Sequence, residues 1–420
     1  MQNDIFLGLD IGTSGARAVA IDGDKTAVCW GSSLMQDHSP DHRDPKCWLA
    51  AARAALHQVG EQIDRTRLRA ICVDGTSGTM IPIDAKGTPL SNGLMYNDPC
   101  EDPHVLDRIA HQAPATSAAH GATSGLAKVL LLQGTRDATK IVHQADWIAG
   151  ALSGIYSSDD NNALKTGFDP VASCWPDWIN MTGVQLDLLP EVHRPGTVLG
   201  TLRRSVALEF DFPLSTELIA GTTDGCAAFL ATGASQPGDG VTSLGTTLVL
   251  KLLSDRPIFA PESGIYSHYL MGLWLAGGAS NTGGGVLLDH FTPPQIAELS
   301  AQIDPDLLLN LGYYPLRHPG ERFPIADPEF APKMYPRPTR DVHFLQAMLE
   351  GIAEIESLGY HKLQALGGPA IKSIRTVGGG AHNKNWMKLR ADRLGVKISV
   401  PPNTDAAYGA ALLARFGMTS

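Results

Sequence analysis

The feature that most constrains the fold is a pair of apolar strands joined by a turn rich in glycine and hydroxyl side chains. It occurs as LGLDIGTSGARAVAID at residues 7–22, in a shorter form as ICVDGTSGTMIPID at residues 71–84, and again as VTSLGTTLVLKL at residues 241–252. Each copy is typical of a β-hairpin with glycine in the turn. One such hairpin opens each half of the chain. This arrangement predicts two structurally similar domains that face each other across a cleft.

Strand-like and helix-like segments alternate along the whole chain, which indicates an α/β fold. The longest helical pattern runs from about His343 to Leu366, with apolar residues at three- and four-residue steps. The segment AAYGAALLARFG, after Pro402, predicts a final helix that packs back on the first domain. We therefore expect an N-terminal domain formed by residues 1–225 and 403–420, and a C-terminal domain formed by residues 226–402.

Composition excludes several classes of function. The 420 residues suffice for two or three domains, and the net charge of −10 argues against nonspecific binding to nucleic acid. No apolar run reaches the length of a membrane span, and the first residues do not resemble a secretory signal. The six cysteines are scattered, without a CxxC pair or zinc-like spacing, which favours reduced thiols. We expect a cytoplasmic protein.

The first hairpin carries the groups of an anion site. Asp10 ends the first strand, Gly12 and Gly15 allow a tight turn that brings backbone N–H groups close to a ligand, and Thr13 and Ser14 add hydroxyl groups. This turn is not a Walker loop, because a strand rather than a helix follows it. An ordinary hairpin with glycine in the turn remains the alternative.

Three later segments add to this pattern. SLGTT, residues 243–247, offers a second turn of the same kind, so that the two turns could hold a polyphosphate from both sides. Asp224 lies at a strand end just before a helix, where a carboxylate can act as a general base or simply as a helix N-cap. VGGGAHN, residues 377–383, permits close contact with a flat ring or a ribose, although a plain glycine turn is the alternative.

Together, and in this order, these segments resemble the FGGY family of carbohydrate kinases over nearly the whole chain. LGLDIGTSGAR is similar to the first phosphate motif of the family, AGTTDGCAAFLATG to the segment with the catalytic Asp, and SLGTTLVL to the second phosphate motif. VGGGAHNKNWMKLRADRLGVKISVP resembles the adenosine motif. The resemblance implies an α/β fold with two RNase H-like domains of the actin/hexokinase/Hsp70-like type.

The resemblance also implies roles for particular residues. Asp224 matches the general base, and Asp10 matches the acidic residue near Mg²⁺ and the transferring phosphoryl group, as a catalytic residue and metal ligand. Residues matching the ATP-binding motifs are Thr13, Ser14, Gly15, Arg17, Gly245, Thr246, Gly378, Gly379, Gly380 and Asn383. Residues matching the sugar side are Asp74, Thr76, Ser77 and Asp98. In this reading the counterpart of the first turn is SLGTT, whereas VDGTSGT faces the sugar.

One stretch departs from the family. The family often has Trp-x-Asp-x-Arg on the sugar side, and here the sequence is YNDPC. Tyr96 takes the place of the Trp, Cys100 takes that of the Arg, and Asp98 is kept. The loss of the Arg removes a rigid fork of five N–H donors. The identity of the sugar therefore does not transfer from any one relative.

The main hypothesis is an ATP- and Mg²⁺-dependent kinase for a small ketose, with D-ribulose first and D-xylulose second. A second hypothesis is a nucleotide-gated sensor that binds a sugar but hydrolyses ATP only slowly. A third, a chaperone or filament former with the same fold, has little support because no segment resembles a peptide-binding domain. The expected partners are a sugar and ATP, with no nucleic acid or membrane, in a monomer or homodimer.

Overall fold

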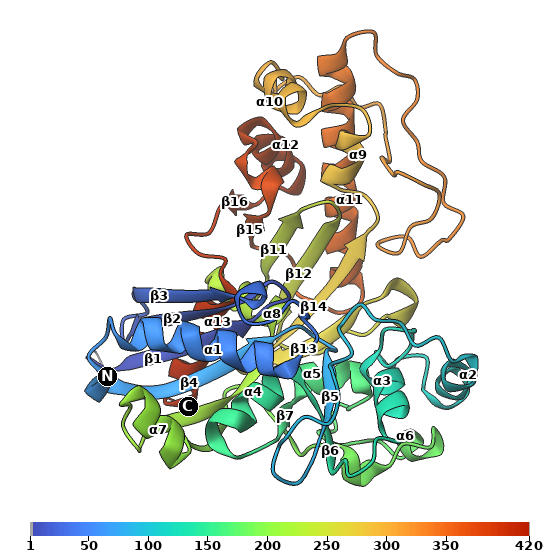
Figure 1. Ribbon diagram of the computed structural model, residues 1–420. Coiled ribbons are helices and arrows are strands. Elements are labelled where there is room, and N and C mark those ends of the chain that lie inside the picture. The colour runs from blue at the N-terminus through green and yellow to red at the C-terminus, as the bar shows by residue number, and fades with distance from the viewer. Residues whose placement is uncertain (1–2, 420) are drawn as a thin grey trace. The chain divides into compact units, whose positions relative to one another are not determined.

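Figure 1 shows a computed structural model of the protein, which describes residues 3–419. The chain forms two compact units, called unit 1 and unit 2 below. Unit 1 comprises Met1–Ala231, His268–Gly272 and Asn403–Ser420, and unit 2 comprises Thr232–Ser267 and Leu273–Pro402. The first boundary falls after Ala231, whereas the sequence suggested residue 225, because helix α8 (Asp224–Ala231) packs against helix α13 (Ala406–Gly417) of unit 1.

The sheet of unit 1 has six strands in the order β3-β2-β1-β4-β10-β9. β1, β4 and β10 are mutually parallel, whereas β2, β3 and β9 run antiparallel to their neighbours. The strands are β1 (Ile5–Ile11), β2 (Gly15–Asp22), β3 (Ala27–Leu34), β4 (Leu68–Gly75), β9 (Val198–Thr201) and β10 (Glu217–Thr223). The three parallel strands therefore end at one edge of the sheet, where ligands bind in open α/β sheets.

Helices cover both faces of this sheet, because its central strands are apolar on both sides. Leu7, Leu9 and Ile11 of β1 belong to the core that also contains residues of α1 (Pro45–Gly60), the helix in front of the sheet in Figure 1. Gly8 points the opposite way, since side chains alternate along a strand. It lies under α13, so close that a Cβ atom there would come within 1.9 Å of the carbonyl oxygen of Ala407.

The expected hairpin over residues 71–84 does not form. β4 has β1 on one edge and β10 on the other, so the chain after Gly75 finds no free edge in this sheet. It turns instead through residues 76–79 into β5 (Met80–Ile83), which pairs with β6 (Lys140–His143) in a separate two-stranded sheet. The sequence pattern of a strand, a glycine turn and a strand is present, but the two strands belong to different sheets.

The remaining elements of unit 1 are mostly short. Its other helices are α2 (Pro103–Gln112), α3 (Gly125–Leu132), α4 (Gln144–Ser153), α5 (Asp160–Ala163), α6 (Trp178–Met181) and α7 (Arg204–Phe210). A two-stranded sheet joins β7 (Ser158–Asp159) to β8 (Val192–His193). The part built from β5, β6, α2, α3 and α6 has an apolar core of its own.

Unit 2 repeats the arrangement of unit 1. Five neighbouring strands of its sheet follow the order β14-β12-β11-β15-β16, with β11, β15 and β16 parallel and β12 and β14 antiparallel. The corresponding strands of unit 1 are β3-β2-β1-β4-β10. The strands are β11 (Asp239–Leu244), β12 (Leu248–Ser254), β14 (Leu273–Ser280), β15 (Ser373–Val377) and β16 (Lys397–Ser399), and β13 (Tyr266–Leu270) precedes β14.

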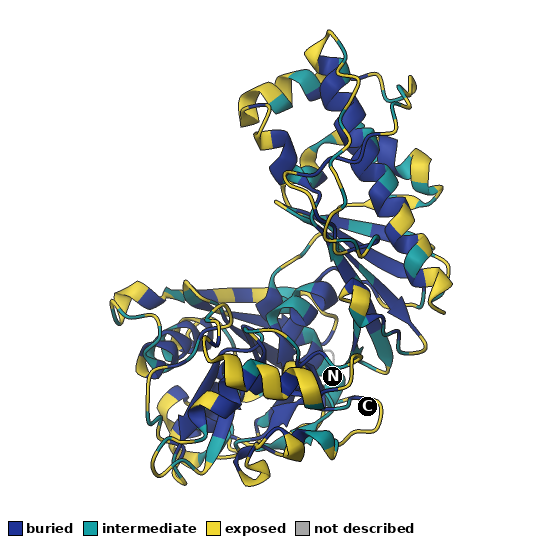
Figure 2. Cartoon of the chain, turned by 90° about the vertical axis from the view of Figure 1, so that its right-hand side faces the viewer, coloured by how far each residue is buried: buried dark blue, intermediate teal, exposed yellow. Residues whose placement is uncertain are grey.

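The helices of unit 2 include the long segment expected from the sequence. α11 (Asp341–Ala365) runs beside β12 and β14, and α12 (Lys384–Leu394) packs against α11 (Figure 1). The shorter helices are α9 (Gly284–Leu288) and α10 (Pro293–Ala301). Figure 2 shows the buried residues gathered between sheet and helices within each unit. Across residues 3–419, no helix combines the length and the apolar character that a membrane crossing needs.

Candidate active site

Three carboxylates of unit 1 gather where its parallel strands end. Asp10 is the next-to-last residue of β1 and pairs in register with Asp74 of β4. Thr222 of β10 pairs with Asp74 on its other side, and Asp224 follows β10 as the first residue of α8. Residues paired in register point to the same face of a sheet. The strand topology thus brings together residues separated by more than two hundred positions in the sequence.

Asp10 is held in place by Arg17 of the following strand. Its side chain is buried, and Oδ2 accepts hydrogen bonds from Nε of Arg17 at 3.1 Å and from Nη2 at 2.5 Å. Arg17 remains half exposed, so the guanidinium group can also meet a ligand. Between them, the backbone N–H of Gly12 donates to the carbonyl oxygen of Gly15 and closes the turn.

Asp74 lies beside Asp10 in the neighbouring strand and is fully buried. Within residues 3–419, neither of its carboxyl oxygens has a conventional hydrogen-bond donor. Burial, and secondly the negative charge of Asp10, raise the pKa of Asp74 well above its ordinary value. The sequence suggested that Asp74 contacts a sugar hydroxyl. The structure places it beneath the surface instead, as a carboxyl group that favours its protonated form.

A hollow of about 540 Å³ opens in front of these strand ends. It is lined by Asp10, Gly12, Thr13, Arg17, Thr76, Ser77, Tyr96, Lys165, Asp224, Gly225, Ala228, Thr404 and Ala406. Six residues singled out from the sequence in unit 1 are therefore brought together: Asp10, Thr13, Arg17, Thr76, Ser77 and Asp224. Four others do not line the hollow: Ser14, Gly15, Asp74 and Asp98. The hollow has the mixture of carboxylate, hydroxyl and cationic groups that a polyhydroxylated ligand and a phosphoryl group require.

Asp98 is engaged by a residue that the sequence did not point to. Its two carboxyl oxygens accept hydrogen bonds from Nη1 and Nη2 of Arg43, at 2.7 and 2.8 Å. The backbone N–H of Met95 donates to Asp98 at 2.8 Å as well. Arg43 lies near the start of α1, far from Asp98 in sequence. In this chain it gives Asp98 the paired N–H contacts that Cys100 cannot provide.

A buried lysine supports the loop that carries Thr76 and Ser77. The ammonium group of Lys128, on α3, donates to the carbonyl oxygen of Gly78 at 2.7 Å and to that of Thr123 at 3.3 Å. Burial lowers the pKa of Lys128 to about 8. Thr76 is further fixed because its hydroxyl group donates to the side-chain oxygen of Gln144 and pairs with the hydroxyl group of Thr79. Contacts with the protein interior thus fix this loop, while Ser77 faces the hollow.

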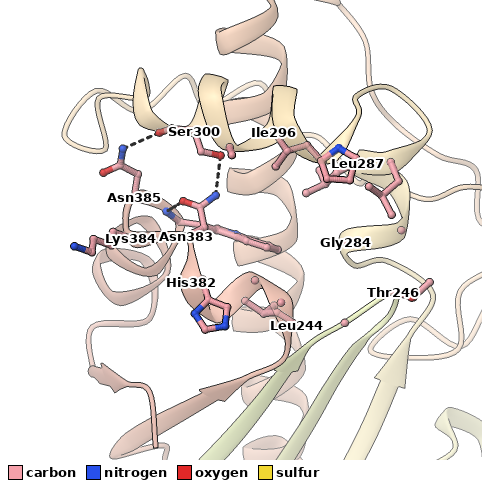
Figure 3. A pocket seen from close by; sticks show the side chains of 18 of the residues that line it. Leu244, Thr246, Gly284, Leu287, Ile296, Ser300, His382, Asn383, Lys384 and Asn385 are labelled. Carbon is pink, nitrogen blue, oxygen red and sulfur yellow. Dashed lines mark hydrogen bonds between the residues drawn. The ribbon is translucent and has the colours of Figure 1, made fainter.

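Unit 2 has a larger hollow, of about 800 Å³, where β11 and β15 end (Figure 3). One wall is formed by the turn after β11 with Gly245 and Thr246, and another by Gly379 and Gly380 after β15. Helices α9 and α10 close it with apolar side chains, among them Leu287, Leu288, Ile296 and Ala297. An apolar cavity bordered by glycine backbone suits a flat aromatic base joined to phosphate groups.

Most of the residues expected in unit 2 line this hollow, namely Gly245, Thr246, Gly379, Gly380 and Asn383. Asn383 also caps α12, since its side-chain oxygen accepts from the N–H of Trp386, and its amide donates to Ser300 at 2.8 Å (Figure 3). Gly378 instead makes the turn. Its φ of +85° favours glycine, and a Cβ atom would approach the carbonyl oxygen of Leu244 to 2.7 Å.

The wall formed by α9 and α10 was not predicted from the sequence. The sequence feature that could have indicated this wall is the run NTGGG at residues 281–285, which places Gly284 and Gly285 against the turn after β11. The N–H groups of these two glycines donate to the carbonyl oxygens of Gly245 and Thr246. The glycine run after β14 thus allows the backbone at the start of α9 to pack against the turn after β11, and this contact forms one edge of the hollow.

In the part of each unit that the structure describes, there is no preformed site for a metal ion. Within residues 3–419, no group of three or more His, Cys, Asp or Glu side chains is arranged to hold one. Mg²⁺ in phosphoryl-transfer sites needs only one or two carboxylates, and takes its other ligands from phosphates and water. Asp10 fits that pattern, because Arg17 engages only its Oδ2 atom.

Two protein-family models match this chain. Residues 5–116 match the N-terminal domain of the FGGY family of carbohydrate kinases, and residues 240–418 match the C-terminal domain of the same family. Together the two matches cover well over half of the chain. They include the turn after β1 in unit 1 and the turns after β11 and β15 in unit 2.

Curated and solved relatives agree with these matches. A xylulose kinase of Staphylococcus epidermidis is 23% identical, over 100% of this chain and 89% of that protein. An autoinducer-2 kinase of Yersinia enterocolitica is 25% identical, over 99% of this chain and 87% of that protein. The crystal structure of a "xyloylose kinase" from Brucella ovis has a TM-score of 0.84 and 25% identity, covering 99% of this chain and 90% of that one.

Proposed function

We propose a function from the premise that this chain belongs to the FGGY family of carbohydrate kinases. The predicted fold class and the predicted sugar kinase are thereby confirmed. The finer proposal is that the protein transfers the γ-phosphoryl group of ATP to a hydroxyl group of a small ketose. The observation that carries it is the hollow of unit 1, in which Asp224 and Asp10 share a surface with Thr13, Arg17, Thr76 and Ser77.

D-Xylulose and D-ribulose are the first acceptors to test. The hypothesis from the sequence placed D-ribulose first. The curated relatives named xylulose kinases support D-xylulose, and they span nearly the whole chain. At identities of 23%, a relative's name does not fix the substrate of this protein. We therefore place D-xylulose first and D-ribulose second.

In this proposal each residue of unit 1 has a distinct task. Ser77 and Thr76 lie on the anchored loop, where Ser77 can donate to and accept from sugar hydroxyl groups. Asp224 accepts the proton of the attacking hydroxyl group as its oxygen approaches phosphorus. Thr13 and Arg17 provide donors to the oxygens of the transferring group. Arg17 can do so while its contact with Asp10 keeps the guanidinium group oriented.

ATP would bind mainly through unit 2, with its base in the hollow between the glycine turns and α9–α10. Backbone N–H groups at the turns suit its phosphates. Mg²⁺ would be held by Asp10 and phosphate oxygens, and when bound it would neutralise charge on the transferring group. Asp10 is suited to this role because the fold buries it at the strand end, with Oδ1 outside its contact with Arg17.

Replacement of Asp224 tests this proposal. We expect Asp224→Asn to lower kcat about 10²- to 10⁴-fold, corresponding to roughly 3–5 kcal/mol, because the base is lost while the shape of the side chain is kept. ADP release would be measured with Mg-ATP and D-xylulose or D-ribulose, alongside a blank without sugar. Asp187→Asn is a matched control, since Asp187 is exposed in the segment Leu186–Leu188. A fully active Asp224→Asn enzyme would remove Asp224 from the mechanism.

A further inference from the structure

Lys165 brings a positive charge into the hollow of unit 1 that the proposed reaction does not use. It lies in the short turn Leu164–Thr166 and is exposed on the wall of the hollow. Over the part of the chain that the structure describes, no hydrogen bond or ion pair engages its ammonium group. The other cations nearby are engaged, since Arg17 binds Asp10 and Lys128 binds two carbonyl oxygens.

The position of Lys165 assigns it to the side of the acceptor. The charge of Asp224 stabilises its ammonium group, and its own charge disfavours that of Lys128, so it lies within electrostatic reach of both. Lys128 supports the carbonyl group of Gly78, next to Ser77. Lys165 lines the same hollow as the proposed base Asp224 and as Ser77 of the loop proposed to bind the sugar. It does not belong to the turn that carries Thr13.

The surroundings of Lys165 favour a ligand that brings a negative charge of its own, in addition to the nearby charge of Asp224. Although the side chain reaches solvent, protein surrounds it on most sides, and this environment lowers the pKa of the ammonium group. A neutral sugar filling the hollow would displace water from the ammonium group and offer only hydroxyl oxygens as acceptors in its place. A carboxylate would accept a hydrogen bond between two charged groups, and hydrogen bonds to ionised groups are roughly twice as strong as those between neutral groups.

We propose that the acceptor carries a carboxylate that pairs with Lys165, so that the substrate class is a small ketose acid rather than a neutral ketose. This inference rests on the proposed kinase function, and at the same site it sets a ketose acid ahead of the neutral D-xylulose and D-ribulose. The carboxylate would lie at the end of the sugar away from the hydroxyl group that faces Asp224. Lys165 would then act in binding and specificity, while the phosphoryl transfer stays as described above.

Matched pairs of acceptors test this proposal by direct binding. D-Fructuronate differs from D-fructose, and D-tagaturonate from D-tagatose, only by a carboxylate in place of one terminal alcohol. Calorimetric titration of the full-length wild-type protein should show at least one acid binding about tenfold or more tightly than its neutral partner. Lys165→Met should lower the affinity for that acid at least about tenfold more than the affinity for the neutral sugar.

Two further variants separate charge from structure. Lys165→Arg should restore most of the preference for the acid, because it keeps the positive charge. Lys86→Met, a change of the same kind at an exposed lysine of unit 1, should leave the preference as in the wild type. If no acid binds more tightly than its partner, or if Lys165→Met weakens both members equally, the proposal is wrong. An increased KM for ATP as the sole effect would assign Lys165 to the phosphate instead.

Failure of this inference can be told apart from failure of the kinase function, because ADP release is measured with the same pairs. Sugar-stimulated ADP release without any preference for an acid would contradict the proposal that the acceptor carries a carboxylate, and would leave the kinase proposal intact. Binding of an acid that depends on Lys165, without ADP release from any sugar, would contradict the kinase proposal and leave the cation site intact.

Discussion

The charge of one buried residue, Asp74, depends on its place in the sheet. Its carboxyl group is fully buried beside Asp10 in the neighbouring strand. Burial and the charge of Asp10 raise its pKa well above the ordinary value near 4. In the folded state this group therefore holds a proton at pH values at which the unfolded chain has lost it. Stability must then fall as the pH rises from the ordinary pKa towards the raised one.

This linkage predicts how an Asp74→Asn variant behaves. The amide keeps the shape but cannot ionise, so the variant avoids the loss of stability that the wild type suffers. We expect it to have a higher Tm than the wild type at pH 8, with a difference that shrinks as the pH approaches 4. Each kcal/mol corresponds to about 2–4 °C in a domain of this size. A difference in Tm that does not change with pH would contradict the raised pKa.

Single residues also show what the sequence could and could not predict. Asp10, Thr13 and Asp224 were found because each lies in a recognisable turn or at a strand end. Lys165 and Arg43 were not singled out, since the positions of their side chains follow only from how the loops fold. Asp98 was expected on the sugar side, but its pairing with Arg43 depends on a contact between residues 55 positions apart.

Between elements, β1 packs very closely against α13 in unit 1. Gly8 leaves no room for a side chain under Ala407, and Gly409 of α13 similarly meets the carbonyl oxygen of Ala227 in α8. Glycine at these positions lets the C-terminal helix lie directly on the strand that carries Asp10. The sequence predicted that the last helix returns to the first domain, but it did not reveal which face of which strand it covers.

This packing predicts a large effect of a single methyl group. Gly8→Ala would place its Cβ atom 1.9 Å from a backbone oxygen, so α13 or β1 must move. We expect a loss of about 3 kcal/mol or more in the free energy of unfolding, measured in urea. Gly134→Ala is the matched control, because nothing lies within 4 Å of its Cβ position. Equal stability of the two variants would contradict the close contact of β1 and α13.

Unit 2 is stabilised by a buried ion pair whose network joins two helices to the sheet. Nε and Nη2 of Arg390, on α12, donate to the carboxylate of Glu356, on α11, at 2.5 and 2.6 Å. Thr242 of β11 and Thr376 of β15 complete the network. Both charged side chains are fully buried. A local sequence pattern does not show such a pair, because its partners come from different helices.

Breaking this pair should be costly. We expect Arg390→Met to lower the free energy of unfolding by about 3–5 kcal/mol, because Glu356 is left buried without its partner. The double variant Arg390→Met with Glu356→Leu should recover part of that loss, since it removes both charges. Urea unfolding of the three proteins gives the comparison. A double variant less stable than Arg390→Met would contradict the expectation that the unpaired charge of Glu356 causes the loss of stability.

At the scale of the whole molecule, the chain contains one fold twice. The hairpins at residues 7–22 and 241–252 predicted this repeat correctly, and each forms the first two strands of its sheet. The hairpin at residues 71–84 was a wrong prediction, because a local pattern does not tell whether a strand will have a free edge. The repeat gives each unit a hollow at the ends of its parallel strands, one charged and one largely apolar.

The central claim is that this molecule transfers a phosphoryl group to a sugar rather than to water. Mass spectrometry of the products formed from Mg-ATP and each sugar tests it most directly, with the neutral ketoses and ketose acids named above as acceptors. We predict a singly phosphorylated sugar in an amount equal to the ADP formed, and its loss in Asp224→Asn. ADP accompanied only by inorganic phosphate, at the same rate with every sugar and without one, would contradict this account.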